Sequence, residues 1–190
     1  MTRGIGIFAL AALPLGALAQ QPASNFDYTY VDVGYVDGEA NAGPFEVDGD
    51  GLALRGSLAL GSKLHVFGEY STLDLDGGVD TTALTVGVGL HHALQSNLHF
   101  VGEVGYVNAE GDTPFGDADD DGLGLSAGLR YRANQDIELE GTIHYVDLDD
   151  SNTSLALRAR YFFTPSFALT GGLLLDDGDT GWTIGIRAGF

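Results

Sequence analysis

Residues 123–131 read Leu-Gly-Leu-Ser-Ala-Gly-Leu-Arg-Tyr, and residues 137–145 read Ile-Glu-Leu-Glu-Gly-Thr-Ile-His-Tyr. In both stretches an apolar residue alternates with a glycine, a small polar residue or a charged one. A period of two places successive side chains on opposite faces of a β-strand, so each stretch predicts a strand with one apolar and one polar face. Only residues 132–136 separate the two stretches. The sequence therefore predicts an antiparallel hairpin.

The same alternation recurs outward from this hairpin over most of the chain. The alternating segments are residues 27–36, 52–60, 64–71, 82–90, 98–106, 123–131, 137–145, 155–163, 167–175 and 182–190. Short connections at 61–63, 91–97, 133–136 and 164–166 alternate with mostly longer ones, rich in Asp and Gly, at 37–50, 74–80, 108–121, 147–152 and 176–181. Short periplasmic turns and longer outer loops are typical of transmembrane β-barrels. We expect an all-β, antiparallel up-and-down barrel of about ten strands; eight strands is the alternative.

The first 19 residues predict a secretory signal peptide. Arg3 is the only early charge, residues 5–18 are apolar, and Ala17-Leu18-Ala19 gives the small-x-small pattern of a cleavage site. We expect cleavage after Ala19 and a single barrel domain over residues 20–190. After Ala19 the chain lacks the 18 or more unbroken apolar residues of a membrane-spanning helix. With no cysteine, it has no lipoprotein anchor, disulfide or thiolate metal site.

Three features indicate that the apolar face meets lipid. A soluble periplasmic ligand-binding barrel would have the same period with its apolar face inside. Here the polar face is mostly Gly, Ala, Ser and Thr, and the chain has one lysine, whereas a solvent-exposed face usually carries many long charged residues. The aromatic residues of the apolar face gather at strand ends, where rings favour the membrane interfaces. They are Tyr35, Tyr70, Tyr106, Tyr145 and Trp182 near the long loops, and Phe100, Tyr131, Tyr161, Phe163, Phe167 and Phe190 near the short turns.

The charged residues within the predicted spans provide the third feature, because all of them after Asp27, the first residue of the first span, fall on the polar face. They are Asp32, Arg55, Glu69, Glu103, Arg130, Arg132, Glu138, Glu140, Arg158, Arg160 and Arg187. Unpaired charges in a narrow barrel are costly, so these side chains predict a paired network. Arg158 and Arg160 are at heights that suit Glu138 and Glu140. Such a network is either a structural plug or the selectivity lining of a narrow pore.

The five long loops carry 20 acidic residues and no Lys or Arg. A formal charge of −19 argues against nucleic acid as a partner, because phosphate is repelled. An ordinary solvated surface accounts for acidic loops, and the functional alternative is Ca²⁺ or Mg²⁺ bound close to lipopolysaccharide phosphates. Asp117, Asp119, Asp121 and Gly122 match the D-x-D-x-D-G opening of an EF-hand loop. The match stops there, because Gly128 stands at position twelve and a strand follows. No other cofactor is expected.

The sequence does not favour an enzyme. Catalysis at the outer rim requires acid, base or nucleophile groups there. Of the histidines only His144 approaches the outer loops, with Asp147 and Asp149 nearby, and Ser151 is interpreted as a turn residue. A histidine satisfied within the lumen is the simpler interpretation.

Several stretches resemble a family of small outer-membrane barrel proteins of xanthomonad-type bacteria. They are residues 28–36 (Tyr-Thr-Tyr-Val-Asp-Val-Gly-Tyr-Val), 65–71 (His-Val-Phe-Gly-Glu-Tyr-Ser), 86–89 (Val-Gly-Val-Gly) and the closing 182–190. That family was once described as the source of a secreted quorum-sensing or immune-elicitor factor. The resemblance implies an outer-membrane barrel and gives no catalytic residues to carry over. The ending, with alternate apolar residues and a terminal Phe190, also looks like the signal read by the barrel-assembly machinery.

Together these observations predict a monomeric outer-membrane barrel with a structural or surface-interaction role. The alternative function is a narrow passive pore for small solutes or ions.

Overall fold

The computed structural model describes residues 26–42, 45–113, 116–148, 151–176 and 179–190. Within these ranges every regular element is a β-strand, and no helix is long and apolar enough to span a membrane. The strands are β1 Tyr30–Ala42, β2 Phe45–Leu60, β3 Leu64–Leu75, β4 Val79–Gln95, β5 Leu98–Thr113, β6 Gly116–Arg132, β7 Ile137–Asp147, β8 Ser151–Thr164, β9 Phe167–Asp176 and β10 Asp179–Gly189. The predicted signal peptide, residues 1–19, lies outside the described residues.

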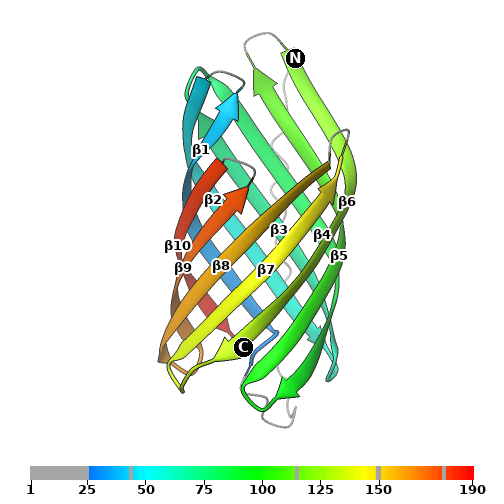
Figure 1. Cartoon of the computed structure of the whole chain (residues 1–190), viewed down its shortest axis with the longest axis vertical. Helices are drawn as coiled ribbons and strands as arrows, with labels where there is room; N and C mark the ends of the chain where they lie inside the picture. The colour runs from blue at the N-terminus through cyan, green and yellow to red at the C-terminus, as the bar shows by residue number, and fades with distance from the viewer. Residues whose placement is uncertain (1–25, 43–44, 114–115, 149–150, 177–178) are drawn as a thin grey trace, which may run out of the picture.

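The strands form one closed antiparallel barrel in which each strand pairs with its neighbours in sequence. β1 closes the barrel against β10, with Val31 opposite Ala188 and Tyr35 opposite Ile184. Closure leaves no unpaired sheet edge, which is the condition for strands to cross lipid. The prediction of ten strands is confirmed, and the eight-stranded alternative is wrong (Figure 1).

The two faces of the strands differ as the alternation predicts. On β6, Leu125 and Leu129 are exposed on the outside of the barrel, whereas the inward-facing Arg130 is 3% exposed. The aromatic residues predicted for the two strand ends, among them Trp182 and Phe190, are also exposed on the outer surface, except for the half-buried Phe100. The apolar face therefore lies outside and the charged face inside.

Glycine sets the tight connection between β3 and β4. Gly77 and Gly78 have φ values of +96° and +77°, in the left-handed region that glycine enters without steric penalty. Two successive residues with positive φ suit a hairpin turn whose twist matches that of the flanking strands.

The acidic connections are mostly strand, which corrects the predicted loops. β5 continues to Thr113 and β6 begins at Gly116, so the expected loop 108–121 is largely a paired hairpin. Residues 37–50 are likewise mostly strand. The apolar alternation stops at the lipid boundary, but backbone pairing does not depend on it and continues into water. The β5–β6 hairpin rises beyond the others at the upper end of the barrel (Figure 1).

A second correction concerns residues 91–97, which the sequence predicts to be a turn. β4 extends to Gln95 and pairs His91 with Val101 and His92 with Phe100, with a register shift between Ala93 and Gln95. The apolar pattern ends at Leu90 because the next outward position holds His92.

The two ends of the barrel are distinguished by their connections. The end at the β2–β3, β4–β5, β6–β7 and β8–β9 connections is called the short-turn end. The opposite end, which carries the acidic connections, is called the hairpin end.

Candidate functional site

Three neighbouring strands bring arginines onto both sides of Glu138. In register, Glu138 on β7 lies opposite Arg132 on β6 and Arg160 on β8. Its Oε1 accepts hydrogen bonds from Arg130 Nη2 at 2.8 Å and Arg160 Nη1 at 2.8 Å, and Arg132 Nη2 lies 3.0 Å from its Oε2. The side chain is 0% exposed. Three guanidinium groups thus surround one buried carboxylate.

Glu140, two residues further along β7, repeats the arrangement. It lies opposite Arg130 on β6 and Arg158 on β8. Arg158 Nη1 donates to its Oε1 at 3.0 Å, and Arg160 Nη1 donates to its Oε2 at 2.8 Å. Arg160 therefore joins both glutamates, and the two sites form one network.

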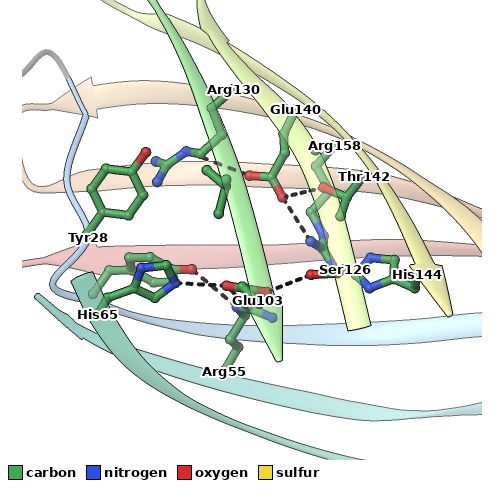
Figure 2. A pocket seen from close by; sticks show the side chains of 13 residues that line it. Tyr28, Arg55, His65, Glu103, Ser126, Arg130, Glu140, Thr142, His144 and Arg158 are labelled. Carbon is green, nitrogen blue, oxygen red and sulfur yellow. Dashed lines mark hydrogen bonds and ion pairs between the residues drawn. The ribbon is translucent and has the colours of Figure 1, made fainter. Parts of the chain in front are cut away.

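A second group of charges gathers around Arg55 on β2. Its Nη1 donates to Glu69 at 2.7 Å, its Nη2 to Glu103 at 2.5 Å, and its Nε to the Tyr30 hydroxyl at 3.2 Å. His65 Nε2 lies 2.9 Å from the same Glu103 oxygen. Figure 2 shows Glu103 approached by His65 on one side and by Ser126 on the other.

The third group joins the first and last strands. Arg187 on β10 donates from Nε and Nη2 to the two carboxylate oxygens of Asp32 on β1, at 2.7 and 2.6 Å. This two-point contact is the strongest geometry for an arginine–carboxylate pair. The guanidinium also lies over the Tyr30 ring, 3.5 Å from its centroid.

All eleven residues predicted for the lumen network therefore form ion pairs with one another. The registers of β6, β7 and β8 account for the contacts of Glu138 and Glu140. The contacts between Arg55 and Glu103 and between Asp32 and Arg187 arise from barrel closure, which brings together residues far apart in sequence.

Aromatic rings close the lumen at the short-turn end. The segment before β1 turns inward, and Phe26 and Tyr28 are 3% and 4% exposed. The Tyr28 ring stacks on His91 with centroids 3.6 Å apart, and its hydroxyl lies 3.1 Å from His99 Nδ1. His65 stacks on the same tyrosine at 5.5 Å. We call Phe26, Tyr28, His65, His91 and His99 the ring cluster.

Arg130 connects the ion-pair network to the ring cluster. The Arg130 guanidinium lies 4.6 Å from the Tyr28 ring centroid, and its Nη1 donates to the Asp27 carbonyl at 3.2 Å. Burial raises the pKa of the Tyr28 hydroxyl to about 12. Burial also raises the pKa of Asp27, although hydrogen bonding from the Thr29 amide opposes the shift. Both shifts follow from the burial of these groups at the short-turn end.

The ring cluster was not predicted, although the sequence holds its signal. Counting in twos back from Asp32 places Tyr30, Tyr28 and Phe26 on the inward face. The alternation of β3, β4 and β5, counted along each strand separately, likewise places His65, His91 and His99 inward. What the count does not reveal is that the segment before β1 turns into the lumen.

Little space is left between the network and the ring cluster. A cavity of about 20 Å³ lies there, bordered by Tyr28, His65, Glu103, Arg130 and Arg158 among others (Figure 2). That volume suits about one water molecule. The hairpin half of the lumen is different, because it contains a hollow of about 470 Å³ above the charges. We call this hollow the vestibule.

The acidic hairpins place aspartates directly opposite one another on successive strands. Register pairs Asp37 with Asp50, Asp50 with Asp74, Asp74 with Asp80, and Asp80 with Asp112. These five residues, on β1 to β5, are called the aspartate row. Asp112 in turn lies opposite Asp117 on β6. The row falls on the outward-facing positions of the strands, beyond the apolar band.

The proposed EF-hand-like residues lie on a strand. β6 carries Asp117, Asp119 and Asp121 at alternate positions, and the side chains of Asp119 and Asp121 are exposed. An extended strand does not curl around an ion as an EF-hand loop does. Among the residues described, no three histidine or acidic side chains group closely enough to hold a metal ion. A calcium or magnesium site here stays a prediction.

Among the described residues weighed for catalysis, Asp147 on β7 lies opposite Ser151 on β8, whereas His144 lies three residues earlier on β7. His144 lines the vestibule, and the adjacent Ser126 hydroxyl donates to Glu103 at 3.2 Å. Ser151 begins β8 with an exposed side chain, which corrects its assignment as a turn residue. Asp149 lies outside the described residues.

Comparison with known proteins agrees with this geometry. A family model described as outer membrane protein beta-barrel domain matches residues 8–163. The KdgM porin in complex with disordered oligogalacturonate is 9% identical, with 85% of this chain and 99% of that chain covered and a TM-score of 0.50. OprG from Pseudomonas aeruginosa is 14% identical, with 89% and 99% covered and a TM-score of 0.49. Ail of Yersinia pestis is 14% identical, with 85% and 97% covered and a TM-score of 0.46.

At 9% identity the likeness to the KdgM porin shows a shared barrel fold and nothing further. No curated protein sequence matches the chain.

Proposed function

The chain belongs to the outer membrane protein beta-barrel domain family, and from that premise we propose that it is a closed outer-membrane barrel with a surface-interaction role. Its outer hairpins bind divalent cations and, through them, the phosphates of lipopolysaccharide. The family places the protein in the outer membrane. The hairpin end then faces outward and the short turns face the periplasm, as in other barrels of this kind.

The observation that carries this proposal is the aspartate row. Like charges directly opposite on paired strands are destabilising, and five successive strands of this barrel carry them in register. A divalent cation between two carboxylates removes that repulsion. Oxygen ligands are those that Ca²⁺ and Mg²⁺ prefer. The same cation can retain a lipid phosphate in its remaining coordination positions.

The filled short-turn half supports a surface role over passive passage. Eleven charges paired with one another and the five rings of the ring cluster lie across the solute path. The vestibule is the one observation that favours the alternative, a narrow pore, because it is wide enough for small solutes. A pore would require the ring cluster to move aside.

Further elements of the proposal follow from the sequence. We infer export by a cleaved signal peptide ending at Ala19, assembly as a monomer, and recognition of residues 182–190 by the barrel-assembly machinery. We infer no enzymatic role, since the Ser126 hydroxyl is committed to Glu103 and not to His144. The narrower resemblance to the xanthomonad-type family stays a prediction.

The test measures how cations stabilise the barrel in a lipopolysaccharide membrane. The protein is refolded into bilayers with and without lipopolysaccharide, and the free energy of unfolding in urea is measured with Ca²⁺ and with a chelator. We expect Ca²⁺ to raise the free energy of unfolding in lipopolysaccharide bilayers and to have a smaller effect in phosphatidylcholine. The Asp50→Asn, Asp74→Asn double variant should lose most of this increment.

Asp136→Asn is the matched control, because Asp136 is an exposed aspartate at the short-turn end. It should keep the full cation increment. An equal increment in the wild type and in the double variant would contradict the proposal, since the aspartate row would then have no part in cation binding.

A further inference from the structure

The lumen-facing residues of the hairpin half are unusual for a water-filled barrel. The vestibule receives an aliphatic side chain from every odd-numbered strand. They are Val36 on β1, Leu73 on β3, Val107 on β5, Val146 on β7 and Leu174 on β9. Water-filled barrels usually have a polar interior. Small residues such as Ala53, Ala83 and Ser154 occupy the positions between and leave the hollow open.

Polar groups at the base of the vestibule have unused hydrogen-bonding capacity. Thr170 lines the vestibule and is 9% exposed, and its Oγ1 has no hydrogen-bond partner among the residues described. A buried hydroxyl without a partner is costly. The Arg158 side chain, which also lines the base, is 24% exposed. The base thus offers a hydroxyl group and the edge of a guanidinium group.

The charges around the vestibule exclude charged ligands. Each carboxylate that lines its base, on Asp32, Glu69 and Glu103, is already paired with an arginine. A cation would therefore find no free partner there. An anion would be repelled by the aspartates of the outer hairpins before it entered.

From these observations we propose that the vestibule is a binding site for an uncharged small molecule with an aliphatic body and one hydrogen-bonding end group. The aliphatic side chains hold the body, and the end group reaches Thr170 at the base. A volume of about 470 Å³ lies within the range of small-molecule sites, about 300–1,000 Å³. The site opens toward the hairpin end, so the ligand enters from outside the cell. This inference goes beyond the surface role and does not depend on cation binding.

Hexan-1-ol and hexane are the probes, because they share a body and differ in one hydroxyl group. Each is titrated into the protein in phospholipid nanodiscs, and amide chemical shifts are followed by NMR. We expect saturable shifts at residues lining the vestibule, such as Val36 and Val107, with hexan-1-ol binding more tightly than hexane. Shifts that grow linearly, or that occur only at lipid-facing residues, would mean partition into lipid and would overturn the proposal.

Two variants locate the probe. Ser154→Phe fills the vestibule and should weaken binding of both probes about tenfold or more. Thr153→Phe, on the outward-facing neighbour, should leave both affinities unchanged. Equal affinities in the two phenylalanine variants would overturn the site.

Thr170→Val keeps the shape of the side chain and removes its hydroxyl, so it tests the base even if Ser154→Phe does not fold. Loss of one hydrogen bond should weaken hexan-1-ol binding about fivefold. The affinity for hexane should stay the same or rise. An unchanged ratio of the two affinities would remove Thr170 from the site and overturn the proposed recognition of the end group.

Discussion

The two halves of the lumen are lined by the same ten strands, yet one is filled and the other is hollow. In the short-turn half the inward positions hold long side chains, such as Arg130, Glu138 and Tyr28, and about 20 Å³ stays open. In the hairpin half they hold small or aliphatic residues, such as Ala53 and Val107, and about 470 Å³ stays open. Strand alternation fixes which face points inward. The length and charge of the inward side chains decide whether that interior is a packed core or a cavity.

The largest expected loss of stability follows from removing the buried glutamates of the filled half. The Glu138→Ala, Glu140→Ala double variant leaves four arginines without their carboxylates. Breaking one buried pair typically destabilises a protein by about 3–5 kcal/mol, so we expect at least that loss in reversible urea unfolding from lipid. Glu110→Ala, an exposed residue of the β5–β6 hairpin, should change stability by less than about 0.5 kcal/mol. A loss under about 1 kcal/mol in the double variant would mean that water screens the network.

Removing the central ring of the ring cluster should have the next largest effect. Tyr28→Ala deletes the stacking on His91 and the contact with Arg130, and we expect a loss of about 3 kcal/mol, as for other buried aromatic side chains. Tyr28→Phe is the matched variant, because it removes only the hydroxyl that contacts His99. It should cost about 1 kcal/mol. Equal losses in the two variants would show that ring packing contributes little.

In the hairpin half, removing a charge should stabilise the protein. Asp50 lies opposite both Asp37 and Asp74, so Asp50→Asn relieves two repulsive pairs. Without divalent cations we expect a gain of about 0.2–1 kcal/mol for each pair in the free energy of unfolding. The gain should shrink as Ca²⁺ is added or as salt screens the charges. A loss of stability in chelator would contradict the repulsion on which cation binding rests.

The smallest expected effect is the contribution of Asp27 to the pH dependence of the free energy of unfolding. Burial raises the pKa of its carboxyl group above the ordinary 3.8, so the folded state holds the proton more tightly than the unfolded state. Stability from this group is therefore present at low pH and is lost as the pH rises from 3.8 through the raised pKa. Asp27→Asn should remove that slope. Urea unfolding of both proteins across this range measures it, and parallel curves would contradict a dry short-turn end.

The sequence was sufficient to predict the strands and their faces. Segments such as residues 123–131 and 137–145 alternate without interruption, and a strand has a period of two for geometric reasons. The pairing of Glu138 and Glu140 with arginines of β8 was also predictable. Consecutive strands in an up-and-down barrel are neighbours, so their registers can be counted from the turn between them.

Other features depend on information that alternation does not contain. The extension of β5 and β6 through residues 108–121 has no apolar pattern, because both faces of that hairpin meet water. The pairing of Asp32 with Arg187 depends on barrel closure. The inward course of Phe26 and Tyr28 depends on the space left between the arginines and histidines, which only the assembled barrel defines. The vestibule likewise arises from ten strands together.

Planar-bilayer recording tests the closed lumen most directly. The wild type is compared with the Phe26→Ala, Tyr28→Ala double variant, which removes two inward rings, and with Phe163→Ala, Phe167→Ala, which removes two lipid-facing rings. We predict no stable single-channel steps for the wild type or for the lipid-facing variant, and measurable conductance only where the inward rings are removed. Reproducible single-channel steps in the wild type would contradict the account and establish the protein as a narrow pore.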